Sequence, residues 1–167
     1  YLDTDVELLR PFGDLLELSG FAGFEDAEHV ATCVLGAEKE HGFFRQAMEL
    51  YEGRTFLREG GEPDLTTNVE ILTGLLGRNG LEPDGARQSV MGMEIFPAEY
   101  FSPRSLETGK LTKTGNTYAI HWFEASWQTG SQRFHRKVAQ VIGKKNTERL
   151  KKLLGRSGGP ESSGRSG

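Results

Sequence analysis

Two aspartates separated by one residue, Asp3 and Asp5, are the first side chains in the sequence that could do chemistry. On an extended segment, residues i and i+2 point to the same side, with Cα atoms roughly 6 to 7 Å apart. One divalent cation can bridge two such carboxylates, and carboxylate oxygens suit ions such as Mg²⁺ and Mn²⁺. The triplet is common by chance, so solvation or helix capping is the alternative interpretation.

The surrounding sequence favours a functional role for the pair. The apolar lead-in of Tyr1 and Leu2 predicts the end of a buried strand, where an acid without a partner is costly. A metal ion would be that partner. The string Asp-Thr-Asp-Val also fits haloacid-dehalogenase-type phosphatases, in which the first Asp is the nucleophile and the second the general acid. That alternative needs a later acidic pair of the Gly-Asp-x-x-x-Asp kind, which the sequence lacks.

A second group of candidates, His121, Ser126 and Trp127, lies at and after the end of the last predicted strand. A neutral imidazole at His121 could add a nitrogen ligand to a carboxylate site. Ser126 could hydrogen-bond a phosphate, and Trp127 could stack on a ring or wall it off. The alternative interpretation is a core histidine and two core tryptophans.

Apolar alternation and periodicity predict an α/β chain whose elements would position these residues. One helix is expected at residues 42–52, and a second is capped by Asp64, Thr66 or Thr67 and ended by Gly80. The other predicted elements are a short helix or turn within residues 6–18, strands at residues 19–24, 30–35, 93–96 and 117–122, and a loop at residues 97–115.

The composition of the 167 residues limits the class of protein. Cys33 is the single cysteine, which excludes an intramolecular disulfide and a cysteine-based zinc site and best fits a reducing cytosol. No apolar run is long enough to span a bilayer. Residues 133–156 hold nine lysines and arginines against one glutamate, whereas residues 1–132 hold ten against 22 acidic residues. This asymmetry argues against a nucleic-acid binder.

The chain therefore divides into three predicted parts. Residues 1–130 form the globular α/β part, residues 131–154 a basic amphipathic helical tail, and residues 155–167 a disordered tail rich in Gly and Ser. The basic tail fits an interfacial helix on anionic phospholipid headgroups, which predicts a cytoplasmic protein peripheral at the inner face of the membrane. It fits equally a helix packed on the body with a solvated charged face.

Several separated motifs with compatible spacing run from residue 1 to about residue 145. They are Tyr1-Leu2-Asp3-Thr4-Asp5-Val6-Glu7, Gly23-Phe24-Glu25, Leu35-Gly36-Ala37, Thr66-Thr67-Asn68, Ile95-Phe96-Pro97 with Glu99-Tyr100-Phe101-Ser102-Pro103, and His121 with Ser126-Trp127. In that order they resemble the bacterial branch of glycosyltransferase family thirty-two, a group that includes capsular-polysaccharide transferases and fungal Golgi initiating mannosyltransferases.

The resemblance implies a GT-A fold, the Rossmann-like fold of nucleotide-diphospho-sugar transferases. It also implies retaining transfer from a UDP- or GDP-sugar to a saccharide or lipid-linked acceptor, with Mn²⁺ or Mg²⁺ as cofactor, in surface or capsular polysaccharide synthesis. Such a protein is a hexosyltransferase.

The resemblance also implies roles for individual residues. Asp3 and Asp5 match the family's Asp-x-Asp, which contacts the metal, the diphosphate and the donor ribose, and Tyr1 belongs to the same donor-binding motif. His121, Ser126 and Trp127 match the element that closes over the metal and the phosphates, so His121 is the third expected metal ligand. Thr67 and Asn68 lie in the helix start that faces the sugar.

The chain departs from the family at three points. Relatives often carry Asn where this chain has Ala31, which bears on a donor-sugar contact. Many carry a second His where it has Trp122, a change expected to affect only packing. Relatives also carry a long stretch before the first motif, so the fold is expected to be incomplete at its N-terminus and this chain alone a poor or inactive enzyme. The remaining alternative is a non-catalytic membrane-surface module, for which mutation of Asp3 or Asp5 would leave function unchanged.

Overall fold

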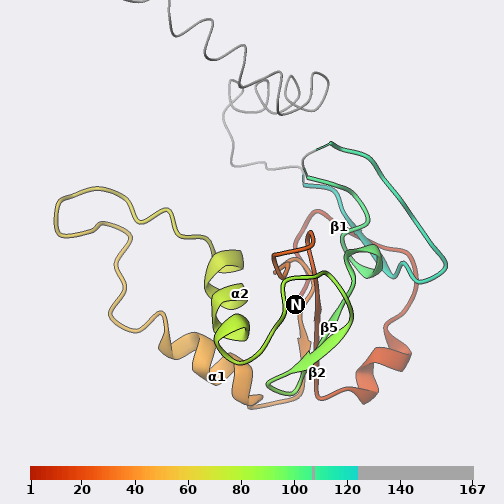
Figure 1. Cartoon of the computed structure of the whole chain (residues 1–167), viewed down its shortest axis with the longest axis horizontal. Helices are drawn as coiled ribbons and strands as arrows, with labels where there is room; N and C mark the ends of the chain where they lie inside the picture. The colour runs from red at the N-terminus through yellow and green to blue at the C-terminus, as the bar shows by residue number, and fades with distance from the viewer. Residues whose placement is uncertain (107, 124–167) are drawn as a thin grey trace, which may run out of the picture. The chain divides into compact units, whose positions relative to one another are not determined.

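Figure 1 shows the chain as a computed structural model, which describes residues 1–106 and 108–123. This part combines strands with short helices, which confirms the predicted α/β class. The helices are α1 (Gly42–Glu49), α2 (Asn68–Arg78) and two 3₁₀ helices at Gly13–Glu17 and Ala98–Tyr100. The strands are β1 (Val6–Leu8), β2 (Gly20–Gly23), β3 (Gly36–Ala37), β4 (Gln88–Val90), β5 (Met93–Phe96) and β6 (Ala119–His121). The predicted tails at residues 131–154 and 155–167 lie outside the described residues.

A four-stranded sheet in the order β3-β2-β5-β4 forms the centre of the fold. Strands β2 and β5 are parallel, with Ala22 opposite Ile95, and the outer strands run antiparallel to their neighbours. The predicted strands at residues 19–24 and 93–96 are thus confirmed. All four residues of β2 are buried, because both faces of the sheet are covered.

Helices α1 and α2 cover one face of this sheet, as Figure 1 shows, and both were predicted. Helix α2 begins with a capping box: the Thr67 hydroxyl accepts the Glu70 N–H, and the Glu70 carboxylate accepts the Thr67 N–H. This satisfies two backbone N–H groups that a helix start leaves without partners. Ala22 and Ile95 point toward the helices and join their core cluster.

An aromatic cluster covers the opposite face of the sheet. Successive strand residues alternate between faces, so Phe21 and Phe96 point away from the helices and pack with Phe101 and Tyr118. The rings of Phe21 and Phe101 stack with centroids 5.9 Å apart, and Phe96 meets Phe101 edge to face. This cluster supports β6 and the residues before it.

Four of the predicted elements need correction. Within residues 6–18, predicted as a helix or turn, Val6–Leu8 forms β1 and the helical part is confined to Gly13–Glu17. The predicted strand at residues 30–35 is an irregular stretch with single bridges at Val30 and Val34. The strand at residues 117–122 shortens to β6. Within the loop at residues 97–115, Ala98–Tyr100 is a 3₁₀ helix, and β4 was not predicted.

The first residues of the chain pair with the stretch that precedes β3. Residues 1–3 run antiparallel beside residues 33–35, with a bridge between Leu2 and Val34. Tyr1 is 74% exposed and Leu2 42% exposed. The prediction that a buried strand leads into Asp3 is therefore wrong, because Tyr1 and Leu2 are exposed, although Cys33 and Val34 beside them are each 1% exposed.

The close approach of Gly36 to Phe21 provides a test of the packing at β3. These residues face each other in the β2–β3 pair, and a Cβ atom on Gly36 would lie 2.1 Å from the buried Phe21 ring. We expect Gly36→Ala to lower the free energy of unfolding by roughly 1 to 3 kcal/mol, because the buried ring has little room to move.

Gly42→Ala is the matched control, since nothing lies within 4 Å of a Cβ atom at Gly42, the first residue of α1. Alanine is the better helix former, so this variant should keep or slightly raise the stability. Urea unfolding followed by circular dichroism measures both. Equal stabilities of the two variants would contradict the described packing.

Candidate metal centre

Three of the residues expected to bind metal, Asp3, Asp5 and His121, lie together in the structure. The Nε2 atom of His121 is 3.3 Å from Oδ1 of Asp5 and 3.9 Å from Oδ2 of Asp3. One ligand atom from each residue lies within 4.8 Å of the other two. Two acidic residues near the start of the sequence thus converge with a histidine more than a hundred residues later.

The pairing of β1 with β6 creates this convergence. Val6 lies opposite His121 in the antiparallel register, so the turn that precedes Val6 and carries Asp5 lies next to His121. The Trp122 N–H donates to the Asp5 carbonyl at 3.0 Å and extends the pairing by one residue. The position of His121 is therefore set by backbone hydrogen bonds and not by its side chain alone.

Asp3 is positioned by the other pairing of the N-terminal segment. Its N–H donates to the Cys33 carbonyl at 2.9 Å, and its own carbonyl accepts the Val6 N–H at 3.2 Å. The second bond closes a turn over residues 3–6, so the expectation that Asp3 and Asp5 lie on one extended segment is wrong. The turn still brings both carboxylates to the same imidazole.

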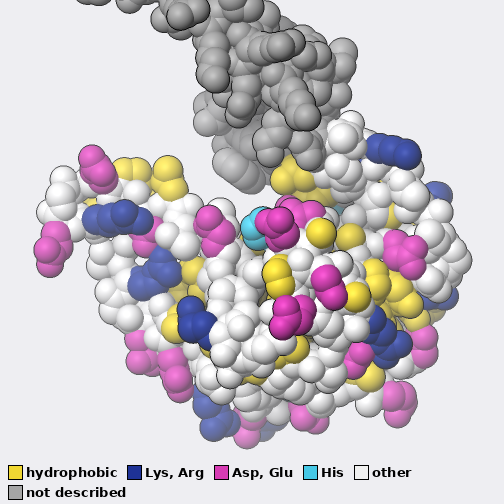
Figure 2. All heavy atoms as spheres, in the orientation of Figure 1, with side chains coloured by type: hydrophobic (Ala, Val, Ile, Leu, Met, Phe, Trp, Pro, Cys, Tyr) yellow, Lys and Arg dark blue, Asp and Glu magenta, His cyan; other side chains and the backbone are white. Residues whose placement is uncertain are grey.

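The three side chains are partly exposed, as a site that must admit a ligand requires. The exposed fractions of the side chains are 30% for Asp3, 21% for Asp5 and 12% for His121. Figure 2 shows one face of the molecule, on which acidic side chains lie among lysines and arginines. The carboxylates are thus open to solvent, and the imidazole lies deeper.

Burial determines the protonation state of His121. Desolvation lowers the pKa of His121 below its usual value of 6.5, and the carboxylates of Asp5 and Asp3 oppose this effect without cancelling it. The imidazole is therefore neutral at pH 7, which is the form that binds metals. Its Nε2 atom faces the carboxylates, whereas its buried Nδ1 atom has no hydrogen-bond partner within the part of the chain that the structure describes.

The donor set fits the expected divalent cation. Two carboxylate oxygens suit Mg²⁺ and Mn²⁺, and an imidazole nitrogen favours Mn²⁺, because Mg²⁺ prefers oxygen ligands and keeps much of its water. A cation would also relieve the repulsion between two carboxylates that share one imidazole. Asp3, Asp5 and His121 are the residues that would hold it.

Tyr1 contacts this group directly. Its hydroxyl donates to Oδ1 of Asp3 at 2.6 Å, while Oδ2 is the Asp3 oxygen that approaches His121. This hydrogen bond and the Asp3 charge raise the pKa of Tyr1 above its usual value of 10.0. The phenol thus stays protonated and fixes the orientation of the Asp3 carboxylate.

Asn68, expected to bind the donor, is the first residue of α2 and connects to the site through one segment. Its side-chain amide donates to the Thr32 hydroxyl at 3.0 Å. Thr32 precedes Cys33, whose carbonyl holds the N–H of Asp3. Thr67 is engaged in the capping box, so its hydroxyl has a structural role.

Two further candidates and two departures from the family remain. Ser126 and Trp127 lie outside the described residues, so their predicted contacts with phosphate and ring remain predictions. Ala31 is buried in the aromatic cluster, where it is 1% exposed. Trp122, a departure expected to affect only packing, donates an indole hydrogen bond to Glu7, so that expectation is wrong.

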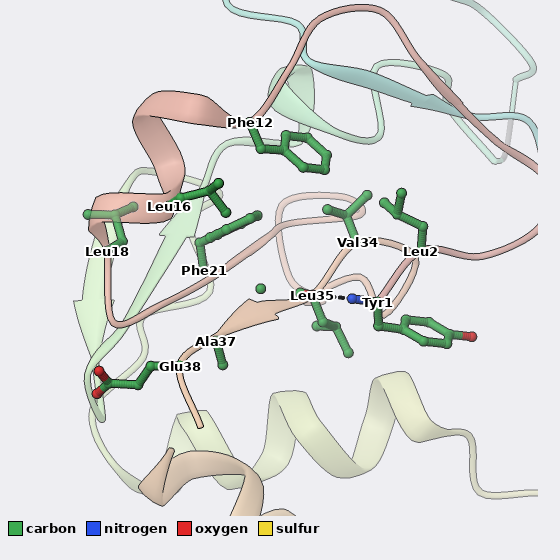
Figure 3. Close-up of a pocket in the computed structure, with 11 residues that line it drawn as sticks. Tyr1, Leu2, Phe12, Leu16, Leu18, Phe21, Val34, Leu35, Ala37 and Glu38 are labelled. Atoms are coloured by element: carbon green, nitrogen blue, oxygen red, sulfur yellow. Dashed lines mark hydrogen bonds between the residues drawn. The ribbon is translucent and has the colours of Figure 1, made fainter. Parts of the chain in front are cut away.

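A pocket of about 360 Å³ adjoins the start of the chain and was not predicted. Figure 3 shows its walls, formed mainly by apolar side chains that include Leu2, Phe12 and Leu16, with the carboxylate of Glu38 also among the lining residues. Tyr1 lines this pocket and also binds Asp3. Its walls come from three separate segments, which a sequence pattern could not bring together.

Comparisons of the chain with protein-family models, with curated proteins and with solved structures gave no match. In the described part of the chain, no helix is both long and apolar enough to cross a membrane.

The environment of Cys33 gives a test of the segment that holds Asp3. Burial raises the pKa of the Cys33 thiol to about 12, and the side chain is 1% exposed. Because the thiolate is the reactive form, we expect iodoacetamide at pH 8 to label the native chain far more slowly than the chain unfolded in guanidinium chloride. Mass spectrometry measures both rates. Equal rates would mean that the segment carrying Cys33 is open in solution.

Proposed function

We propose that this chain carries the metal-binding and donor-binding part of a retaining, metal-dependent glycosyltransferase with a GT-A fold. The observation that carries the proposal is the convergence of Asp3, Asp5 and the neutral His121 within 4.8 Å. The sheet adds support at a coarser level, because it contains the parallel pair β2–β5 between antiparallel neighbours and is covered by helices.

The donor class follows from the chemistry of the residues. A nucleoside diphosphate leaves with a growing negative charge, and a bound Mn²⁺ or Mg²⁺ ion would offset that charge. Asp3 and Asp5 supply the negative charge that holds the cation, and His121 supplies a neutral nitrogen ligand. Tyr1 orients Asp3 by its hydrogen bond. We assign Asn68 to the sugar side of the donor because it begins α2 and connects through Thr32 to the segment that holds Asp3.

The acceptor and the location complete the proposal. A saccharide or lipid-linked acceptor, in surface or capsular polysaccharide synthesis, is what the resemblance to glycosyltransferase family thirty-two implies. The nine lysines and arginines of residues 133–156 would favour anionic headgroups at the cytoplasmic face of a membrane. Ser126 and Trp127 are assigned to the phosphates and the donor on the resemblance alone.

The phosphatase alternative would use Asp3 as a nucleophile instead of a metal ligand. Its Oδ1 atom accepts the Tyr1 phenol at 2.6 Å, which leaves only Oδ2 to attack, and the sequence lacks the later Gly-Asp-x-x-x-Asp pair that such a phosphatase needs. The imidazole beside both carboxylates is also better explained by metal ligation. The transferase is therefore the favoured function.

Loss of one carboxylate should remove most of the metal affinity. We expect the chain to bind Mn²⁺, and Asp5→Asn to weaken that binding by more than the roughly 10- to 100-fold that loss of an outer-shell partner costs. The electron paramagnetic resonance signal of free Mn²⁺ measures the affinity.

Asp26→Asn is the matched control for this experiment. Asp26 also contacts a histidine, with its Oδ1 atom 3.0 Å from His29 Nδ1, but among the described residues this pair belongs to no group of three possible metal ligands. The Asp26→Asn variant should bind Mn²⁺ with the same affinity as the unchanged chain. Equal weakening in both variants would mean that surface charge and not a site binds the ion.

The reaction itself is tested by turnover, with this chain joined to a family-typical N-terminal half, because the chain alone is expected to be a poor or inactive enzyme. Mn²⁺-dependent hydrolysis of one member of a UDP- and GDP-sugar panel, lost in Asp5→Asn, would support the transferase and identify the donor. Hydrolysis of an aryl phosphate without any nucleotide-sugar turnover would reject it in favour of the phosphatase.

A further inference from the structure

Trp122 follows His121 in the chain, and each of its three polar groups has a partner. Its N–H donates to the Asp5 carbonyl at 3.0 Å. Its indole Nε1–H donates to the Glu7 carboxylate at 2.9 Å. Its carbonyl accepts a hydrogen bond from the Arg104 guanidinium. The residue after the candidate ligand is therefore held at its backbone and at its side chain.

These contacts fix Trp122 from two directions. Glu7 belongs to β1, the strand that pairs with β6, so the indole ties the two strands together beyond their backbone bonds. Arg104 comes from a different segment and also lies over the indole ring, with its Cζ atom 5.4 Å from the ring centroid. A cation over an indole face adds an attraction of roughly 0.5 to 1 kcal/mol at exposed sites.

Phe123 completes the surroundings of the imidazole. Its ring centroid lies 3.9 Å from that of His121, with the planes inclined by 40°. Its φ angle is 54°, a left-handed conformation that is unfavourable for a bulky residue. Trp122 is the residue before Phe123, and its contacts help to hold the backbone in this strained conformation. The Phe123 ring therefore remains against the imidazole.

We propose that Trp122 is a positioning residue, which Glu7, Arg104 and the Asp5 carbonyl fasten so that His121 Nε2 points at the carboxylates of Asp3 and Asp5. This inference rests on the proposed metal site and adds to it the residue that orients the nitrogen ligand. Fixing a side chain before the ligand binds removes conformational entropy that binding would otherwise lose. The Nδ1 atom of His121 has no hydrogen-bond partner among the described residues, so the ring is oriented by the approach of Nε2 to Asp5 together with packing and backbone contacts.

Trp122→Phe tests the proposal, because it keeps an aromatic ring under Arg104 while it removes the indole N–H and part of the ring area. We expect the Mn²⁺ dissociation constant to rise about 3- to 10-fold, below the loss expected for a ligand. Glu7→Ala should have the same effect. The double variant should bind Mn²⁺ no more weakly than either single variant, because both substitutions remove the same hydrogen bond between Trp122 and Glu7.

Phe43→Leu separates positioning from general stability. Phe43 is buried in the core cluster beneath the helices, so this variant should unfold more easily and yet keep its Mn²⁺ affinity. If Mn²⁺ affinity falls with stability in all variants alike, Trp122 has only a structural role and the proposal is overturned. Unchanged affinity in Trp122→Phe overturns it as well.

A second measurement does not depend on the metal. In the metal-free chain, ¹³C relaxation of the His121 imidazole should report a lower order parameter in Trp122→Phe than in the unchanged chain. A rigid imidazole in both overturns the positioning role. Absence of Mn²⁺ binding in the unchanged chain overturns the proposed function instead, so the two failures are distinguishable.

Discussion

The antiparallel pairing of β1 with β6 is the constraint on which the candidate metal centre depends. Its register sets Val6 opposite His121, so the turn over residues 3–6, which carries Asp5, lies next to the imidazole. Two isolated strands of three residues would not be stable in water. Their support comes from the aromatic cluster, because Ala119 and Tyr118 are buried in it and the Tyr118 carbonyl accepts the N–H groups of Leu9 and Arg10. The sheet and its aromatic face thus act on the site through this pairing.

The charges that the β1–β6 pairing brings together determine what the site can bind. Two carboxylates and one partly buried imidazole lie within 4.8 Å, and burial keeps the imidazole neutral, so their charges do not cancel. A bound cation would offset the charge of the two carboxylates. Tyr1 orients Asp3 by a phenol hydrogen bond. Trp122 is the residue that we propose to orient His121, through its contacts with Glu7 and Arg104.

The sequence predicted the parts whose signal is local. The helices, β2 and β5 have apolar periodicity, caps or continuous apolar runs, and these patterns report burial directly. Asp3, Asp5 and His121 were predicted as one site because the motifs that hold them resemble those of glycosyltransferase family thirty-two. Strands β1 and β4 have three residues each with an exposed side and carry no clear pattern. The turn at residues 3–6 and the contacts of Trp122 depend on tertiary pairing, so no local pattern could predict them.

The most direct test of the account is the electron spin-echo envelope modulation of Mn²⁺ bound to the chain. The account predicts ¹⁴N modulation from one imidazole nitrogen, which disappears in His121→Gln while Mn²⁺ still binds weakly to the two carboxylates. Incorporation of ¹⁵N-histidine should change the modulation accordingly. Bound Mn²⁺ without any nitrogen coupling, or with a coupling that persists in His121→Gln, would contradict the assignment of Asp3, Asp5 and His121 to a single metal centre.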